Sequence, residues 1–248
     1  MNRITRLIAS MLLALMLVCS CALANELPES TTPRENVQLP ESITGIADAL
    51  KAQESTKAGL SMPTTTDIVT ISPDGTYNVM TNGLNISVYP PFGWYVLTQD
   101  LAAQYDVYSL LASNGIIADP VTAVNEMISN GFHYLMIDPY YGTTVVATVD
   151  IDGLSSFVTD SSALTAAEIE TVKGLVASAN AFPTSVFSTG TENFVKYDTR
   201  NVDGTIIYTA YRNGWCIDFY VIPATYDVET ELANVEYMLY DVAIAPAY

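Results

Sequence analysis

Two alternating apolar runs joined by Asn213-Gly214 constrain the fold more than any other feature. Residues 205–212 and 215–222 show the period-two alternation of β-strands. Asn and Gly both tolerate the positive φ that a two-residue hairpin turn requires. The pattern therefore predicts an antiparallel hairpin, and with it a sheet assembled from local strand pairs.

Residues 84–98 predict a strand, a corner at Pro90-Pro91-Phe92-Gly93 and a second strand led by Trp94. The two prolines remove consecutive amide donors, so strand pairing must stop there. We expect the two strands to pair and seed the sheet, with Trp94 packed under a helix and worth ~3–5 kcal/mol when replaced by alanine. Further strands are expected at 68–70, 77–79, 132–138, 143–151, 184–188 and 193–199.

Residues typical of helix N-termini lie between and after these strands. Asp100 and Asp119-Pro120 begin two predicted helices, the second ending at Asn130-Gly131. Thr165 and Glu168 have the spacing of a capping box, and Asp227 caps a last helix that we expect to include Val242. Strands in hairpins with helices between and after them predict an α+β fold around a largely antiparallel sheet.

The N-terminal 24 residues have the form of a signal peptide. Arg3 and Arg6 precede the apolar run 7–18, and Ala22-Leu23-Ala24 fits a cleavage site. Two alternatives stay open: an uncleaved membrane anchor, or a lipobox-like motif that would make Cys21 a lipidated membrane tether. We expect 1–24 to be a signal peptide, 25–66 a tether with a short helix near 43–57, and 67–248 one folded domain.

Charge and cysteine content restrict the classes of partner. Seven basic residues face 27 acidic residues after Arg6, a net charge of −20, which disfavours nucleic acid and anionic membrane surfaces as partners. Cys216 is the only cysteine beyond residue 21. The exported part therefore has no disulfide framework, a pattern more typical of a secreted or surface-attached bacterial protein.

The order of elements, the Tyr89-Pro90-Pro91-Phe92-Gly93-Trp94 corner and the Asn213-Gly214 hairpin before a closing helix together resemble the Mog/PsbP-like domains over residues 67–245. This resemblance implies an α/β/α sandwich around an antiparallel sheet. It also implies an accessory or scaffolding role rather than catalysis, and it carries over no catalytic residue.

The candidate catalytic and metal-binding residues lack the partners that such chemistry needs. His133, the only histidine, lies in an apolar run, where a structural role is the expected one. Cys216 is expected to be a buried, unreactive thiol. Asp150-Ile151-Asp152-Gly153 departs from a calcium loop at Leu154 and predicts a strand-end turn. We therefore predict no catalytic residues, no metal site and no cofactor.

Sixteen tyrosines are the unusual feature of the composition. Most are explained by packing on sheet faces, but Tyr140 and Tyr141 lie in a predicted turn, where exposed rings could contact a glycan or a protein. The leading hypothesis is an exported, non-enzymatic binding or accessory protein with an unknown protein or glycan partner. The alternatives are a secreted hydrolase with an acidic active site and a carbohydrate-binding module built on Tyr140 and Tyr141.

Overall fold

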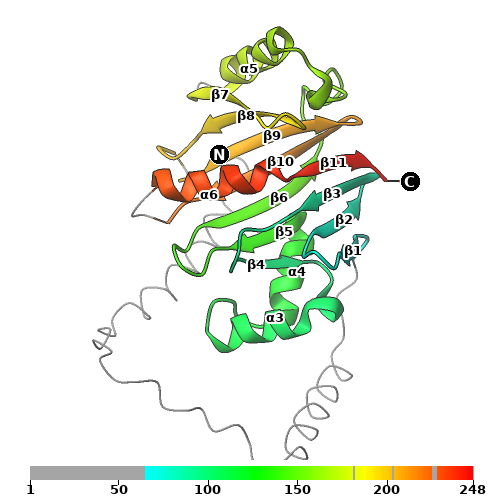
Figure 1. Cartoon of the computed structure of the whole chain (residues 1–248), viewed down its shortest axis with the longest axis vertical. Helices are drawn as coiled ribbons and strands as arrows, with labels where there is room; N and C mark the ends of the chain where they lie inside the picture. The colour runs from blue at the N-terminus through cyan, green and yellow to red at the C-terminus, as the bar shows by residue number, and fades with distance from the viewer. Residues whose placement is uncertain (1–64, 181, 203, 225–227, 248) are drawn as a thin grey trace, which may run out of the picture.

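The computed structural model describes residues 65–180, 182–202, 204–224 and 228–247. The expected signal peptide, the tether with its helix near 43–57, Cys21 and the Asp227 cap lie outside these residues. The described chain combines helices with two antiparallel sheets, so the predicted mixed α+β class is confirmed (Figure 1).

The larger sheet has seven strands in the order β4-β5-β6-β10-β9-β8-β7. The hairpin at Asn213-Gly214 is confirmed: both residues have positive φ (52° and 80°), and Arg212 pairs with Trp215. The strands are β4 (Tyr95–Thr98), β5 (Phe132–Ile137), β6 (Thr144–Asp150), β7 (Thr184–Ser188), β8 (Asn193–Asp198), β9 (Ile206–Arg212) and β10 (Trp215–Ile222).

A second sheet of four strands, in the order β1-β2-β3-β11, was not predicted. Its strands are β1 (Ile68–Ile71), β2 (Tyr77–Thr81), β3 (Leu84–Val88) and β11 (Ala243–Pro246). The expectation that Val242 belongs to the last helix is wrong, because that helix ends at Tyr240 and the chain turns into β11. Val242 is buried all the same, so its apolar character reflects the core it reaches rather than a helical face.

The prediction that 84–98 forms a strand pair is also wrong, because β3 and β4 belong to different sheets. The prolines end pairing so completely that the chain leaves one sheet and enters the other. The Trp94 N–H donates to the Pro91 carbonyl at 3.1 Å, which places Trp94 in the turn before β4. Its side chain is half-buried against the core rather than fully enclosed.

Three of the expected helix starts are visible in their capping bonds. Asp100 and Asp119 each accept an N–H bond at 3.0 Å, from Ala103 and Thr122, and the Thr165 N–H donates to Glu168 Oε2 at 2.8 Å. The helices are α3 (Leu101–Ser113), α4 (Pro120–Asn130), α5 (Ala166–Asn180) and α6 (Val228–Tyr240), with a short 3₁₀ turn η1 (Ser161–Ala163).

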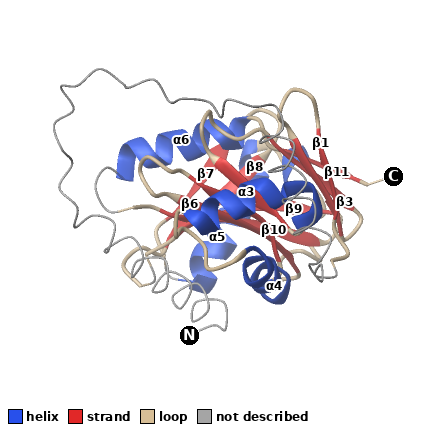
Figure 2. Ribbon diagram, turned by 90° about the horizontal axis from the view of Figure 1, so that it is seen from below, coloured by secondary structure: helices blue, strands red, loops and turns tan. Residues whose placement is uncertain are grey.

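The seven-stranded sheet is covered on both faces (Figure 2). Ile217, Phe219 and Val221 of β10 pack in one apolar cluster with α6 and the four-stranded sheet. The alternate residues of β10 point to the other face, where Tyr220 joins a cluster with α3 and α4, and Cys216 joins one with α5. The period-two alternation of a strand thus divides its side chains between two cores.

Candidate functional site

The turn between β5 and β6 exposes two adjacent tyrosine rings, as predicted. Tyr140 is 83% exposed and Tyr141 is 36% exposed. Their ring centroids are 4.7 Å apart, with the ring planes at 80° to each other. Two neighbouring rings in water offer apolar area together with hydroxyl groups, a combination common in contacts with sugars and proteins. We refer to Tyr140 and Tyr141 as the tyrosine pair.

The backbone under the tyrosine pair is fixed by Asp138. This buried carboxylate accepts the N–H groups of Tyr140 at 2.8 Å and Tyr141 at 3.3 Å through Oδ1. Gly142 closes the turn with φ at +84°, and a Cβ there would lie 3.3 Å from Cβ of Ala224. The turn is therefore held in one conformation, which lowers the entropic cost of binding a partner.

Thr143 joins this turn to α6. Its Oγ1 donates to Oε2 of Glu231 at 2.7 Å, and both residues are buried. The tyrosine pair consequently rests on two strands and a helix rather than on a free loop, an arrangement that keeps a binding surface precise. The sequence offered no local signal for this bond, because Glu231 follows Thr143 by 88 positions and an acid in a first helical turn is already favoured by the helix dipole.

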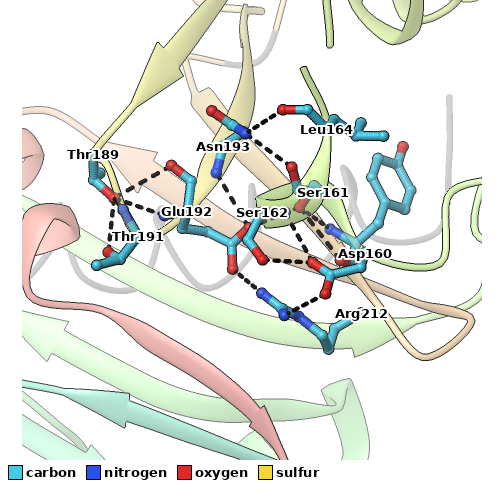
Figure 3. A network of polar contacts seen from close by, with 10 residues as sticks. Asp160, Ser161, Ser162, Leu164, Thr189, Thr191, Glu192, Asn193 and Arg212 are labelled. Atoms are coloured by element: carbon cyan, nitrogen blue, oxygen red, sulfur yellow. Dashed lines mark hydrogen bonds and ion pairs between the residues drawn. The ribbon is translucent and has the colours of Figure 1, made fainter. Parts of the chain in front are cut away.

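Arg212 organises a polar network at the opposite end of the seven-stranded sheet (Figure 3). Its guanidinium donates to Asp160 Oδ2 at 2.9 Å and to Glu192 Oε2 at 2.5 Å. Glu192 Oε1 accepts the Ser161 hydroxyl at 2.8 Å. Burial raises the pKa of Glu192, with the positive charge of Arg212 opposing that shift. We refer to Asp160, Ser161, Glu192 and Arg212 as the arginine clasp, since these bonds fasten η1 to β9 and to the loop before β8.

A second buried acid, Asp218 of β10, faces the α3–α5 side of the sheet. Its Oδ1 accepts the Thr209 hydroxyl at 2.5 Å, and its Oδ2 accepts the Tyr220 hydroxyl at 3.3 Å. Burial raises its pKa to about 6. Burial also raises the pKa of the neighbouring Cys216 thiol, whereas a nucleophilic cysteine needs a lowered pKa. The prediction that Cys216 is buried is confirmed.

His133 acquires a partner that local spacing could not show. Its Nδ1 lies 2.7 Å from Oδ2 of Asp67, and both side chains are buried. Asp67 also uses its own N–H, which donates to the Thr65 hydroxyl at 3.0 Å. The pair joins β5 to the segment just before β1, so the geometry fits the structural role that we expected for His133.

The Asp150–Gly153 segment is a turn that uses its own carboxylates. Asp152 Oδ1 accepts the N–H groups of Leu154 at 2.9 Å and Ser155 at 2.7 Å, and its Oδ2 accepts the Tyr211 hydroxyl at 3.0 Å. Among the residues that the structure describes, no group of three or more His, Cys, Asp or Glu side chains could hold a metal ion. The carboxylate oxygens here hold the backbone of the turn and a neighbouring side chain.

Comparisons of this chain with family models, with curated proteins and with solved structures gave no match. Within the described part of the chain, none of the helices has the length and apolar character needed to cross a membrane.

Proposed function

We propose that this chain is an exported, non-enzymatic binding or accessory protein that acts at the cell surface or outside the cell, and that the tyrosine pair contacts its partner. One observation carries the proposal: Tyr140 and Tyr141 are exposed on a turn whose backbone is fixed by Asp138. Exposing aromatic rings costs hydrophobic free energy, and fixing them in place suits a surface that meets another molecule.

The proposed partner is a glycan or a protein, since tyrosine rings suit both. The acidic composition, with a net charge of −18 for the whole chain, favours a neutral or basic partner over nucleic acid or an anionic membrane. In this proposal the N-terminal segment exports the chain, which is then released, held by an uncleaved anchor, or tethered through Cys21.

Glycan-array binding of the parent protein and of a Tyr140→Ala/Tyr141→Ala variant tests this proposal. Tyr237→Ala is the matched control, because Tyr237 is 67% exposed on α6, six residues beyond the Glu231 that bonds to Thr143. We expect the double variant to lose binding and the control to keep it. If the parent binds a glycan on the array and the double variant binds it equally well, the tyrosine pair is not the contact surface. If the parent binds no glycan, the carbohydrate-binding version is rejected and a protein partner becomes the subject of the same comparison.

For the fold we propose the α/β/α sandwich of the Mog/PsbP-like domains. Support comes from the order of elements, from the corner at Pro90-Pro91-Phe92-Gly93-Trp94, and from the presence of α6 on one face of the seven-stranded sheet and α3–α5 on the other. In this proposal the four-stranded sheet is an addition beside α6. An experimental structure that superposes on a Mog/PsbP-like domain over both helical layers would support it, and one that aligns only strands would contradict it.

A secreted hydrolase is the second candidate, favoured by one observation. The pKa of Asp218 is raised to about 6 by burial, and a carboxyl whose pKa is raised toward neutral pH is typical of general acids in hydrolases. Incubation with a panel of glycan and peptide substrates tests this candidate. Turnover by the parent that is lost in Asp218→Asn would support the hydrolase and contradict the non-enzymatic proposal, whereas the same turnover in both would remove Asp218 from consideration.

A further inference from the structure

A cavity of about 250 Å³ opens beside α6, where β7 and β9 begin and β8 ends. Its lining combines apolar side chains, two hydroxyls and three charged groups: Pro183, Thr184, Ser185, Lys196, Asp198, Arg200, Ile206 and Leu232. Lys196 and Arg200 are two of only four basic residues after residue 64. Half of the basic side chains of the folded domain thus line one small cavity in an acidic protein.

The charged groups of this cavity are already paired with one another or with their neighbours. Nε of Arg200 donates to Asp198 Oδ1 at 2.9 Å, and its Nη2 donates to Oδ2 at 2.6 Å. Lys196 Nζ lies 2.7 Å from Oε1 of Glu236 and 5.1 Å from the centre of the Tyr208 ring. The hydrogen bond with Arg200 lowers the pKa of Asp198, which therefore remains an ionised acceptor.

This pairing decides which ligand chemistry fits. An anion would have to compete with Asp198 and Glu236 for cations that they already neutralise, in a chain of net charge −18. A wholly apolar ligand would desolvate the ion pairs without replacing their bonds to water. A neutral ligand with several hydroxyls can accept from Arg200 or Lys196 and donate to a carboxylate, while its carbon skeleton covers the apolar lining.

We propose that this cavity binds one neutral, hydroxyl-rich ring of about the size of a hexose. Ile206 and Leu232 supply the apolar lining, the Arg200–Asp198 pair meets adjacent hydroxyls from the rim, and Ser185 and Thr184 add further donors and acceptors. The volume of about 250 Å³ lies just below the usual range of ligand pockets, so the cavity suits a single ring.

The cavity opens at the same end of the sheet as the tyrosine pair. Thr144, just after the turn of the tyrosine pair, pairs with Ile222 at the end of β10. Ile206 at the start of β9 pairs with Val221 of β10 on one side and with Asp198 at the end of β8 on the other. These pairs form a continuous row of strand ends from the turn to the cavity. The N-terminal half of α6 lies between them, with Glu231 bonded toward the turn and Leu232 lining the cavity. The hexose site needs no contact from the tyrosine pair and stands whether or not that pair binds a partner.

Saturation-transfer NMR of the parent protein with glucose, galactose, mannose, N-acetylglucosamine and glucuronate tests the proposal. Ser185→Trp fills the cavity from an exposed position on β7, and Ser188→Trp places the same ring at an exposed position of that strand outside the lining. We expect at least one neutral sugar to bind the parent. The dissociation constant should rise about tenfold or more in Ser185→Trp, equivalent to a loss of about 1.4 kcal/mol, and stay unchanged in Ser188→Trp.

The comparison of Ser185→Trp with Ser188→Trp is repeated in a Tyr140→Ala/Tyr141→Ala background, which keeps this test distinct from that of the proposed function. Any sugar contact made by the tyrosine pair is absent from that background, and we expect the tenfold difference between the two tryptophan variants to persist there. The cavity proposal is overturned if no neutral sugar binds, if only glucuronate binds, or if Ser185→Trp binds as well as Ser188→Trp. Loss of monosaccharide binding in the tyrosine variant would overturn the separation of the two sites.

Discussion

Polar groups are bonded and enclosed at one end of the seven-stranded sheet and lie open to solvent at the other. At the end with the arginine clasp, Glu192 and Arg212 are bonded to each other and enclosed. At the other end, the ion pair of Arg200 and Asp198 lines an open cavity and the tyrosine pair faces solvent. The sheet is continuous between them, so the contrast comes from the loops and caps: one end encloses its charged groups, and the other exposes the groups that we propose as ligand contacts.

The largest expected effect lies at the arginine clasp. Arg212→Ala would leave the Glu192 carboxylate buried without its cation, and we expect the free energy of unfolding to fall by about 3–5 kcal/mol. Urea denaturation measures it. Replacing both residues by methionine should cost less than the single change, because no buried charge is then left unpaired. A single variant within about 0.5 kcal/mol of the parent would show that the clasp is not structural.

Asp218 should give the fold a pH dependence. Its folded-state pKa of about 6 lies above the ordinary aspartate value of 3.8, so its proton is held more tightly in the folded protein. The resulting stability is fully present below pH 3.8 and is lost as the pH rises through about 6. The loss should be roughly 3 kcal/mol, at about 1.4 kcal/mol per pKa unit. Urea midpoints of the parent and Asp218→Asn between these pH values should diverge, and parallel curves would contradict the shift.

Trp94→Ala should cost less than the sequence suggested. The side chain is half-buried in a turn between the two sheets, so part of its apolar surface already meets water. We expect a loss of about 2 kcal/mol, measured by urea unfolding, instead of the ~3–5 kcal/mol of an enclosed tryptophan. A loss at the upper end of that larger range would show that Trp94 carries more of the core than its exposure indicates.

The smallest effect on stability is expected at the tyrosine pair. Tyr140→Ala/Tyr141→Ala removes one ring that is 83% exposed and one that is 36% exposed, both outside the apolar core, and keeps the backbone bonds to Asp138. The melting temperature should therefore stay close to that of the parent, with a change in unfolding free energy within about 0.5 kcal/mol. A large loss would mean that the pair belongs to the structural part of the molecule.

Local signals in the sequence were sufficient for most single elements. Asp100 and Asp119 cap helices because a short carboxylate side chain reaches a backbone N–H donor within one turn, and Asn213-Gly214 folds back because both residues accept positive φ. The exposure of the tyrosine pair followed from its place in a turn. In each case the determining interaction spans a few residues.

Which strands share a sheet depends on pairing partners that lie far apart in the sequence, and the sequence patterns did not predict it. β11 pairs with β3 about 160 residues earlier, and its Ala-Ile-Ala-Pro sequence is too short to show a period. The same limit hid the bonds of His133 to Asp67 and of Thr143 to Glu231. Cys216, Asp218 and Tyr220 alternate along β10 and therefore share one face of the seven-stranded sheet. This alternation was the one local signal that could have indicated a row of polar groups on that face.

Hydroxyl-radical footprinting, with and without cell-surface material from the source organism, tests the central contrast most directly. Tyr140 and Tyr237 are 83% and 67% exposed, so both should be oxidised readily in the free protein. We expect Tyr140 and Tyr141 to become protected when the surface material is present, while Tyr237 keeps its rate of oxidation. Protection of Tyr237 with unchanged oxidation of Tyr140 and Tyr141 would contradict it.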